Sequence, residues 1–101
     1  MNKEEIKKID FSKEADLLKA VGHPVRLKIV AGLIESECCV KDIWECLDLP
    51  QPVVSQHLSI LRNKGIVTAT REGNRTNYQV SSPVVKIIVT SCMNEKKEGR
   101  S

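Results

Sequence analysis

The chain has 101 residues and a formal net charge of +3, with 41% hydrophobic, 29% charged and only 3% aromatic residues. This length predicts one domain, and the scarcity of aromatic side chains argues against RNA-recognition and single-strand-binding folds, which stack bases on them. No apolar run reaches the ~20 residues of a membrane span, and the charged N-terminus lacks the apolar core of a signal peptide, so we expect a cytoplasmic protein. The basic excess lies in residues 51–80, where Arg and Lys oppose a single acid, Glu72. This distribution permits a nucleic-acid partner.

The first half of the chain has the spacing of three helices. Ser12 is a good N-cap, and apolar residues then recur at helical intervals, which predicts a helix over residues 12–21. Pro24 is favoured at a first helical position and predicts a second helix over residues 24–35. A third, short helix is expected to end near Asp48.

The second half changes its period after a fourth helix. Residues 52–64 keep the helical spacing and are followed by Gly65, a residue typical of helix C-termini. Residues 67–80 then alternate around Gly73–Asn74, which predicts a β-hairpin with a type II′ turn. Ser82–Pro83 predicts the start of a last helix. That helix is apolar on more than one face, which in so small a protein indicates packing against a second chain.

The outer face of the fourth helix carries side chains suited to reading DNA. Val54, Leu58 and Leu61 form one apolar stripe, and no Asp or Glu occurs from Gln51 to Arg71. Short amides, hydroxyls and a guanidinium, without carboxylates that phosphates would repel, are what a helix needs in the major groove. The basic turn of the hairpin suits contact with phosphates or the minor groove. Residues predicted for these roles are Ser55, Gln56, Ser59, Arg62, Arg71, Asn74 and Arg75.

The order of elements predicts a mainly α fold with a β-hairpin, a winged helix-turn-helix of order α-α-α-α-β-β-α that forms a homodimer. The third and fourth helices are the helix-turn-helix, and the hairpin is the wing. We expect a flexible N-terminal extension over residues 1–10, a domain for DNA binding and dimerisation over residues 11–93, and a solvated tail over residues 94–101.

Several motifs resemble the ArsR/SmtB family of bacterial winged-helix repressors. They are HPVRL over residues 23–27, SQHL followed by LR over residues 55–62, GIV over residues 65–67, and Tyr78 after the wing. The resemblance implies a homodimer, joined through the first and last helices, that binds a pseudo-palindromic operator and leaves it when an inducer binds or modifies the dimer. By position it implies DNA contacts by Gln51, Ser55, Gln56, His57, Ser59 and Arg62 on the recognition helix and by Arg71, Asn74 and Arg75 on the wing.

The two histidines need separate interpretation. His57 lies at the edge of the apolar stripe of its helix. It either contacts a base or phosphate, or is half-buried and hydrogen-bonded to the neighbouring helix. His23, which precedes a proline at a helix start, is expected to be structural.

Two adjacent cysteines, Cys38 and Cys39, are candidates for sensing an inducer. A thiolate near a helix start and near Lys41 would react with peroxide or a persulfide donor, and the neighbouring thiol, or Cys92 across the dimer, would resolve it. Alternatively, a soft metalloid such as As(III) binds Cys38 and Cys39, or both thiols are buried as small hydrophobes. Cys46 is expected to fill the core.

One metal site of the resembled family is absent from this sequence, and a second is altered. The last helix has no His or Asp, and Lys41 stands where the second thiol of a Cys-x-Cys site would be. No cofactor is expected.

Two other classes of function fit less well. A protein-interaction module without an operator would have an apolar outer face on the fourth helix, and this face is polar. An enzyme would need a catalytic constellation, but both histidines have other uses and there is no glycine-rich phosphate loop or carboxylate pair. The sequence therefore predicts a transcriptional regulator that binds DNA.

Overall fold

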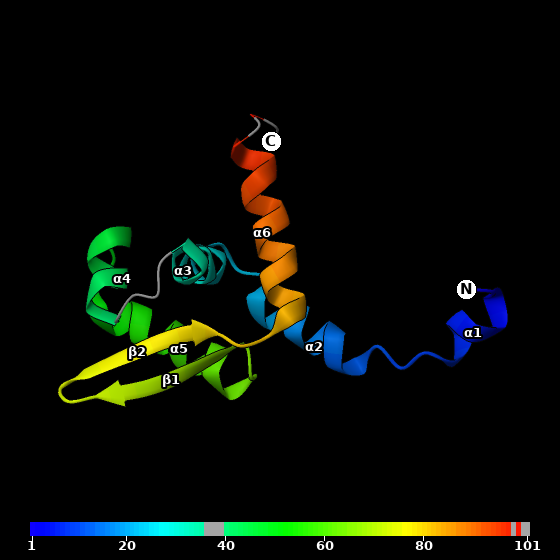
Figure 1. The fold of residues 1–101 in the computed structure, drawn as a ribbon, viewed down its shortest axis with the longest axis horizontal. Helices are drawn as coiled ribbons and strands as arrows, with labels where there is room; N and C mark the ends of the chain where they lie inside the picture. The colour runs from blue at the N-terminus through cyan, green and yellow to red at the C-terminus, as the bar shows by residue number, and fades with distance from the viewer. Residues whose placement is uncertain (36–39, 98, 100–101) are drawn as a thin grey trace.

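A computed structural model describes residues 1–35, 40–97 and 99. Figure 1 shows α3 end-on between α4 and α6, with the hairpin below it and α5 partly behind the hairpin. The helices are α1 (Lys3–Lys8), α2 (Ser12–Val21), α3 (Pro24–Glu35), α4 (Val40–Leu47), α5 (Gln51–Asn63) and α6 (Pro83–Lys97), and the strands are β1 (Val67–Glu72) and β2 (Arg75–Val80).

The predicted bounds of α2 and α3 are confirmed at both ends. The predicted capping role of Ser12 is wrong, because Phe11 is the N-cap of α2 and Ser12 is already helical. The carboxylate of Asp10 accepts hydrogen bonds from both the backbone N–H and the hydroxyl of Ser12. An ionised carboxylate is a stronger acceptor than a hydroxyl, so the acid two residues earlier satisfies this end of the helix.

Both ends of the chain contain more helix than the sequence indicates. Within the segment expected to be a flexible extension, α1 forms a short helix without buried residues and projects from the body of the molecule (Figure 1). The solvated tail was expected from residue 94, but α6 continues to Lys97. Lys96 and Lys97 suit the negative end of the helix dipole, and Lys97 pairs with Glu35 at 3.4 Å.

The core is aliphatic and is built around α3, which contacts α4, α5, α6 and β2. Burying the aliphatic side chains of this core is the main favourable contribution to the free energy of folding. No helix among the described residues is long and apolar enough to cross a bilayer. The fully buried side chains of greatest volume are Ile29, Val30, Val54, Leu58, Leu61, Ile66, Val67, Val85 and Val89.

A tight turn joins α4 to α5 and forms the helix-turn-helix. Asp48 ends α4 in the left-handed region at φ 54°, a conformation that Asp tolerates better than most residues. The backbone N–H of Leu49 reaches back to the carbonyl of Trp44 at 3.1 Å. Pro50 follows this turn, where it cannot extend α4, and it is the N-cap of α5.

The wing is the antiparallel hairpin of β1 and β2. Its register pairs Val67 with Val80 and Glu72 with Arg75, which leaves Gly73 and Asn74 as a two-residue turn. Gly73 has φ 61° and Asn74 is not in the left-handed region. Positive φ at the first central residue alone is the type II′ pattern that the sequence predicted.

Two glycines should respond to alanine in opposite directions. Gly65 ends α5 at φ 75°, so Gly65→Ala strains the backbone and should lower the free energy of unfolding by about 1–2 kcal/mol. Gly32 lies inside α3, and a Cβ there meets no atom within 4 Å. Gly32→Ala should therefore raise the free energy of unfolding by about 0.5–1 kcal/mol. Urea denaturation of both variants checks this, and a loss at Gly32 would contradict it.

Candidate nucleic-acid interface

α5 separates an apolar face from a polar one. Val54, Leu58 and Leu61 are each at most 1% exposed, and they pack the helix against the core. The opposite face is solvent-exposed and, like the rest of α5, has no carboxylate. Each residue predicted for that face except His57 is exposed, namely Gln51, Ser55, Gln56, Ser59 and Arg62.

The N-terminal turn of α5 follows the short turn after α4 and contains no acidic residue. A helix start carries the positive end of the dipole, and here Pro52 has no N–H while the N–H of Val53 donates to the carbonyl of Pro50 at 3.0 Å. Gln51 and Ser55 lie exposed in the first turns of this helix. This end of α5 can therefore approach phosphates while its polar side chains reach base edges.

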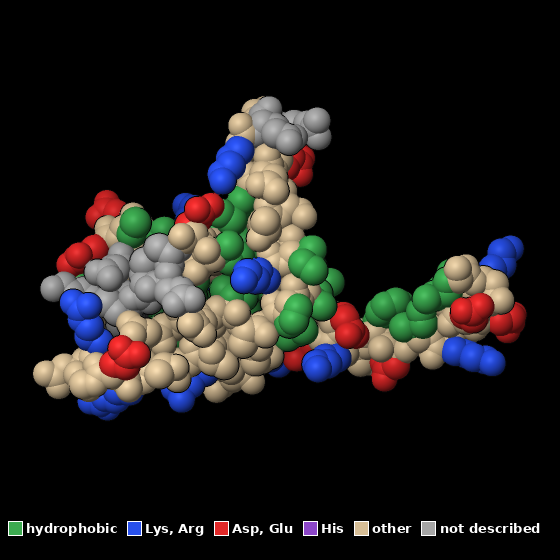
Figure 2. Space-filling model, viewed as in Figure 1, with side chains coloured by type: hydrophobic (Ala, Val, Ile, Leu, Met, Phe, Trp, Pro, Cys, Tyr) green, Lys and Arg blue, Asp and Glu red, His purple; other side chains and the backbone are tan. Residues whose placement is uncertain are grey.

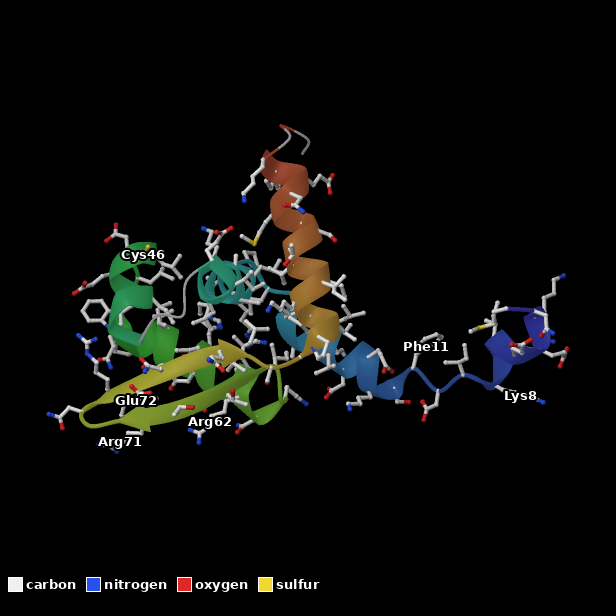
Figure 3. The ribbon with its side chains drawn as sticks, viewed as in Figure 1. Lys8, Phe11, Cys46, Arg62, Arg71 and Glu72 are labelled. Carbon is white, nitrogen blue, oxygen red and sulfur yellow. The ribbon has the colours of Figure 1, made fainter. Side chains whose placement is uncertain are left out.

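The hairpin sorts its charges between its two faces. Figure 3 shows Arg71 on the same lower edge of the molecule as Arg62, while Glu72 points to the other side of the strand. Arg75 is opposite Glu72 in the register, so it shares the face of Glu72 and not that of Arg71. Arg71 thus lies on the face of the wing opposite to that of Glu72 and Arg75, and Arg75 lies with Asn74 at the tip.

His57 is turned toward the protein interior. Its Nδ1 accepts a hydrogen bond from Nε of Arg26 at 3.1 Å, and its ring centroid is 4.7 Å from that of His23. Of the two sequence interpretations, this is the contact expected of a half-buried histidine bonded to the neighbouring helix. His23 in turn accepts the backbone N–H of Val25 at its own Nδ1, 3.1 Å away, and so caps α3.

The position of His57 predicts how stability changes with pH. Burial, with the nearby His23 and the positive charge of Arg26, lowers the pKa of His57 from its ordinary value of 6.5. In the unfolded chain the ring takes up a proton near pH 6.5, whereas the folded protein resists protonation until a lower pH. The unfolded state therefore binds more protons in this window, and folding is destabilised as the pH falls below 6.5.

Urea denaturation at several pH values on either side of this window measures the effect. The free energy of unfolding should be constant above the ordinary histidine pKa and should decline below it. His57→Asn keeps an acceptor near Nδ1 without a titrating group, so its decline should be shallower. An equal decline in both proteins would assign the effect to other groups.

The structure describes only part of the predicted sensing set. Cys38 and Cys39 lie outside the described residues. Cys92 is exposed on α6 and lines an open apolar groove of about 320 Å³ between α3 and α6. The prediction that Cys46 fills the core is wrong, since its thiol is exposed and the core side of α4 is taken by Ile43. Among the described residues, no three His, Cys, Asp or Glu side chains are grouped to hold a metal ion.

Comparisons with known proteins agree with this geometry. The profile described as bacterial regulatory protein, arsR family, matches residues 23–69. The transcriptional repressor PagR of Bacillus anthracis is 38% identical over 83% of this chain and 85% of its own. The HTH-type transcriptional repressor SmtB of Mycobacterium tuberculosis is 46% identical over 65% of this chain, which spans about half (49%) of that relative. The structure of reduced HlyU from Vibrio cholerae superposes with a TM-score of 0.78 at 34% identity, covering 87% and 92% of the two chains.

Proposed function

The chain belongs to the ArsR family of bacterial regulatory proteins, and from this premise we propose that it is a homodimeric repressor that binds operator DNA. Membership of a family of regulatory proteins agrees with the prediction from the sequence that this protein is a regulator and not an enzyme. The observation that carries the proposal is the exposed, carboxylate-free face of α5 beside the arginine on β1. SmtB and PagR are both named as repressors, which favours repression as the direction of regulation.

The proposal assigns the DNA contacts to two classes. Gln51, Ser55, Gln56 and Ser59 are placed to read base edges, because amides and hydroxyls match the donors and acceptors in the major groove. The arginines and Asn74 contact phosphates or the minor groove and fix the register of the protein on the duplex. The arginines in this second class are Arg62, Arg71 and Arg75.

The dimer is proposed to form through α2 and α6. Leu18 on α2 and Val84 and Ile87 on α6 are 43%, 39% and 67% exposed. Figure 2 shows hydrophobic side chains gathered where these two helices meet. Uncovered apolar side chains on adjoining helices mark a protein interface, and a second copy places a second α5 for the other half of a pseudo-palindromic site.

Selection from a randomised duplex library tests DNA binding. The wild-type protein should enrich a pseudo-palindromic sequence, and its affinity for that duplex should fall steeply with salt, with a slope of about 0.9 per phosphate contact. Arg71→Gln removes one such contact from each protomer of the proposed dimer, so it should reduce this slope by about 1.8. A library without enrichment would overturn operator recognition, and an affinity independent of salt would overturn the phosphate contacts.

We further propose that oxidation of Cys38 and Cys39 releases the DNA. The pair directly precedes α4, which begins at Val40, and a helix start together with Lys41 favours the thiolate form. One thiolate attacks hydrogen peroxide, the O–O bond breaks, and a sulfenic acid and hydroxide form; the hydroxide takes up the proton that the thiol released and becomes water. The second thiol then displaces the sulfenic oxygen as water and forms an S–S bond. Two electrons and two hydrogens pass from the thiols to the peroxide.

Parallel titrations distinguish this chemistry from its alternatives. Hydrogen peroxide should release the selected duplex, with a mass loss of two hydrogens that dithiothreitol reverses. Cys39→Ser should block release, and Cys46→Ser, which removes an exposed thiol outside the pair, should not. Cys92→Ser tests pairing across the dimer. Release by As(III) alone would replace redox sensing with a metalloid response, and no release by either would leave both thiols as packing.

A further inference from the structure

One guanidinium connects three helices beneath the recognition surface. Arg26, in the first turn of α3, donates through Nη1 to the backbone carbonyl of Ala20 at 2.9 Å, in the last turn of α2. It also donates through Nε to Nδ1 of His57, in the middle of α5, at 3.1 Å. A single planar group therefore fixes α5 against both α2 and α3.

This connection requires a neutral imidazole. A guanidinium only donates, so Nδ1 of His57 must have no proton and Nε2 carries it. His23 has the same requirement, because its Nδ1 accepts the N–H of Val25. The two rings lie together, tilted by 49°, between the start of α3 and α5. The cluster is thus ordered by directional hydrogen bonds and not by burial alone.

The other contacts that hold α5 are weaker guides to its orientation. Its core face consists of Val54, Leu58 and Leu61, and apolar packing is non-directional. Lys64 at its C-terminal end pairs with Asp16 of α2 at 3.1 Å, but both side chains are about half exposed, and such pairs are weak. The bond from Arg26 is the part-buried polar contact on the middle of the helix, beside Gln56.

We propose that Arg26 is a positioning residue for DNA binding, holding α5 through His57 at the angle set by α2. The inference rests on the proposed function. Recognition constellations tolerate deviations of only about 0.5 Å and 10–20°. Because α2 also carries part of the proposed dimer face, the same contact relates each recognition helix to the two-fold axis. Loss of the contact would misplace both helices relative to their half-sites while leaving every DNA-facing side chain in place.

A double-mutant cycle on a duplex selected by the wild-type protein tests this assignment. Arg26→Met and His57→Leu should each weaken binding by about tenfold. The losses should not add, so the affinity of the double variant should equal that of whichever single variant binds less tightly. The slope of affinity against salt should not change, since neither side chain contacts a phosphate. His57→Asn, which keeps an acceptor near Nδ1, should retain affinity within about threefold of wild type.

Several outcomes would overturn the assignment. Additive losses in the cycle, or a loss in His57→Asn equal to that in His57→Leu, would make His57 a direct DNA contact. Wild-type affinity in Arg26→Met would remove Arg26 from the interface altogether. Thermal unfolding and sedimentation confirm that each variant is folded and dimeric. If Arg26→Met does not fold, Arg26→Lys keeps the stem and charge without the two-pronged donation, and its unchanged affinity would overturn the inference equally. Failure of the wild-type protein to enrich any duplex would instead refute the proposed function.

Discussion

Replacing Ile87 with glutamate is expected to convert the proposed dimer to monomers and to weaken binding to a two-half-site duplex by about 100-fold. Ile87 is 67% exposed on α6, on the side away from buried Val85 and Val89, so the fold does not depend on it. In a dimer through α2 and α6 its side chain is buried against the partner, where an unpaired carboxylate is strongly unfavourable. The loss follows because linked half-site contacts become separate binding events.

Sedimentation velocity and fluorescence anisotropy measure the two parts of this expectation. Lys86→Glu is the matched control, because it puts a carboxylate one residue away on a flank of α6 that lies with Leu33 and Val80. The control should stay dimeric. A dimeric Ile87→Glu with wild-type affinity would place the dimer interface elsewhere on the molecule.

Gln56→Glu is expected to weaken binding to the selected duplex by about 10- to 100-fold without changing stability. The two side chains have nearly the same shape, and residue 56 is exposed on α5, so helix and core are preserved. The substitution removes an amide donor that we propose to read a base edge, a contact worth about 1–3 kcal/mol, and adds a charge that the phosphates repel.

Anisotropy at several salt concentrations, with urea denaturation alongside, checks this expectation. Gln79→Glu makes the same chemical change at an exposed position of β2 outside the predicted interface, and it should affect binding much less. Equal losses at the two positions would indicate general charge repulsion and not base reading by α5.

The local structure of this protein could be predicted closely because its signals are local. Pro24 sets the start of α3, and Gly65 and Gly73 adopt the left-handed conformations that end α5 and turn the hairpin. These residues act through their own backbone preferences, which do not depend on distant parts of the chain. The alternation of β1 and β2 similarly fixed their register through the two-residue turn.

The sequence predictions are wrong for one face of a helix and for one helix cap. Cys46 has the spacing of a core residue, yet Ile43 takes the buried side of α4. Ser12 is a good cap by type, but the carboxylate of Asp10 occupies that role. Arg26 escaped notice as a functional residue. In the sequence it lies within the HPVRL motif, but no local pattern pairs it with His57.

By itself, the sequence determined the order of the helices, the hairpin and its turn, and which face of α5 is polar, because backbone preferences and hydrophobic periodicity are written into successive residues. Only the tertiary structure shows that His57 accepts a hydrogen bond from Arg26, since the donor lies on another helix. Such pairings are set when separate elements pack, and no local pattern records them.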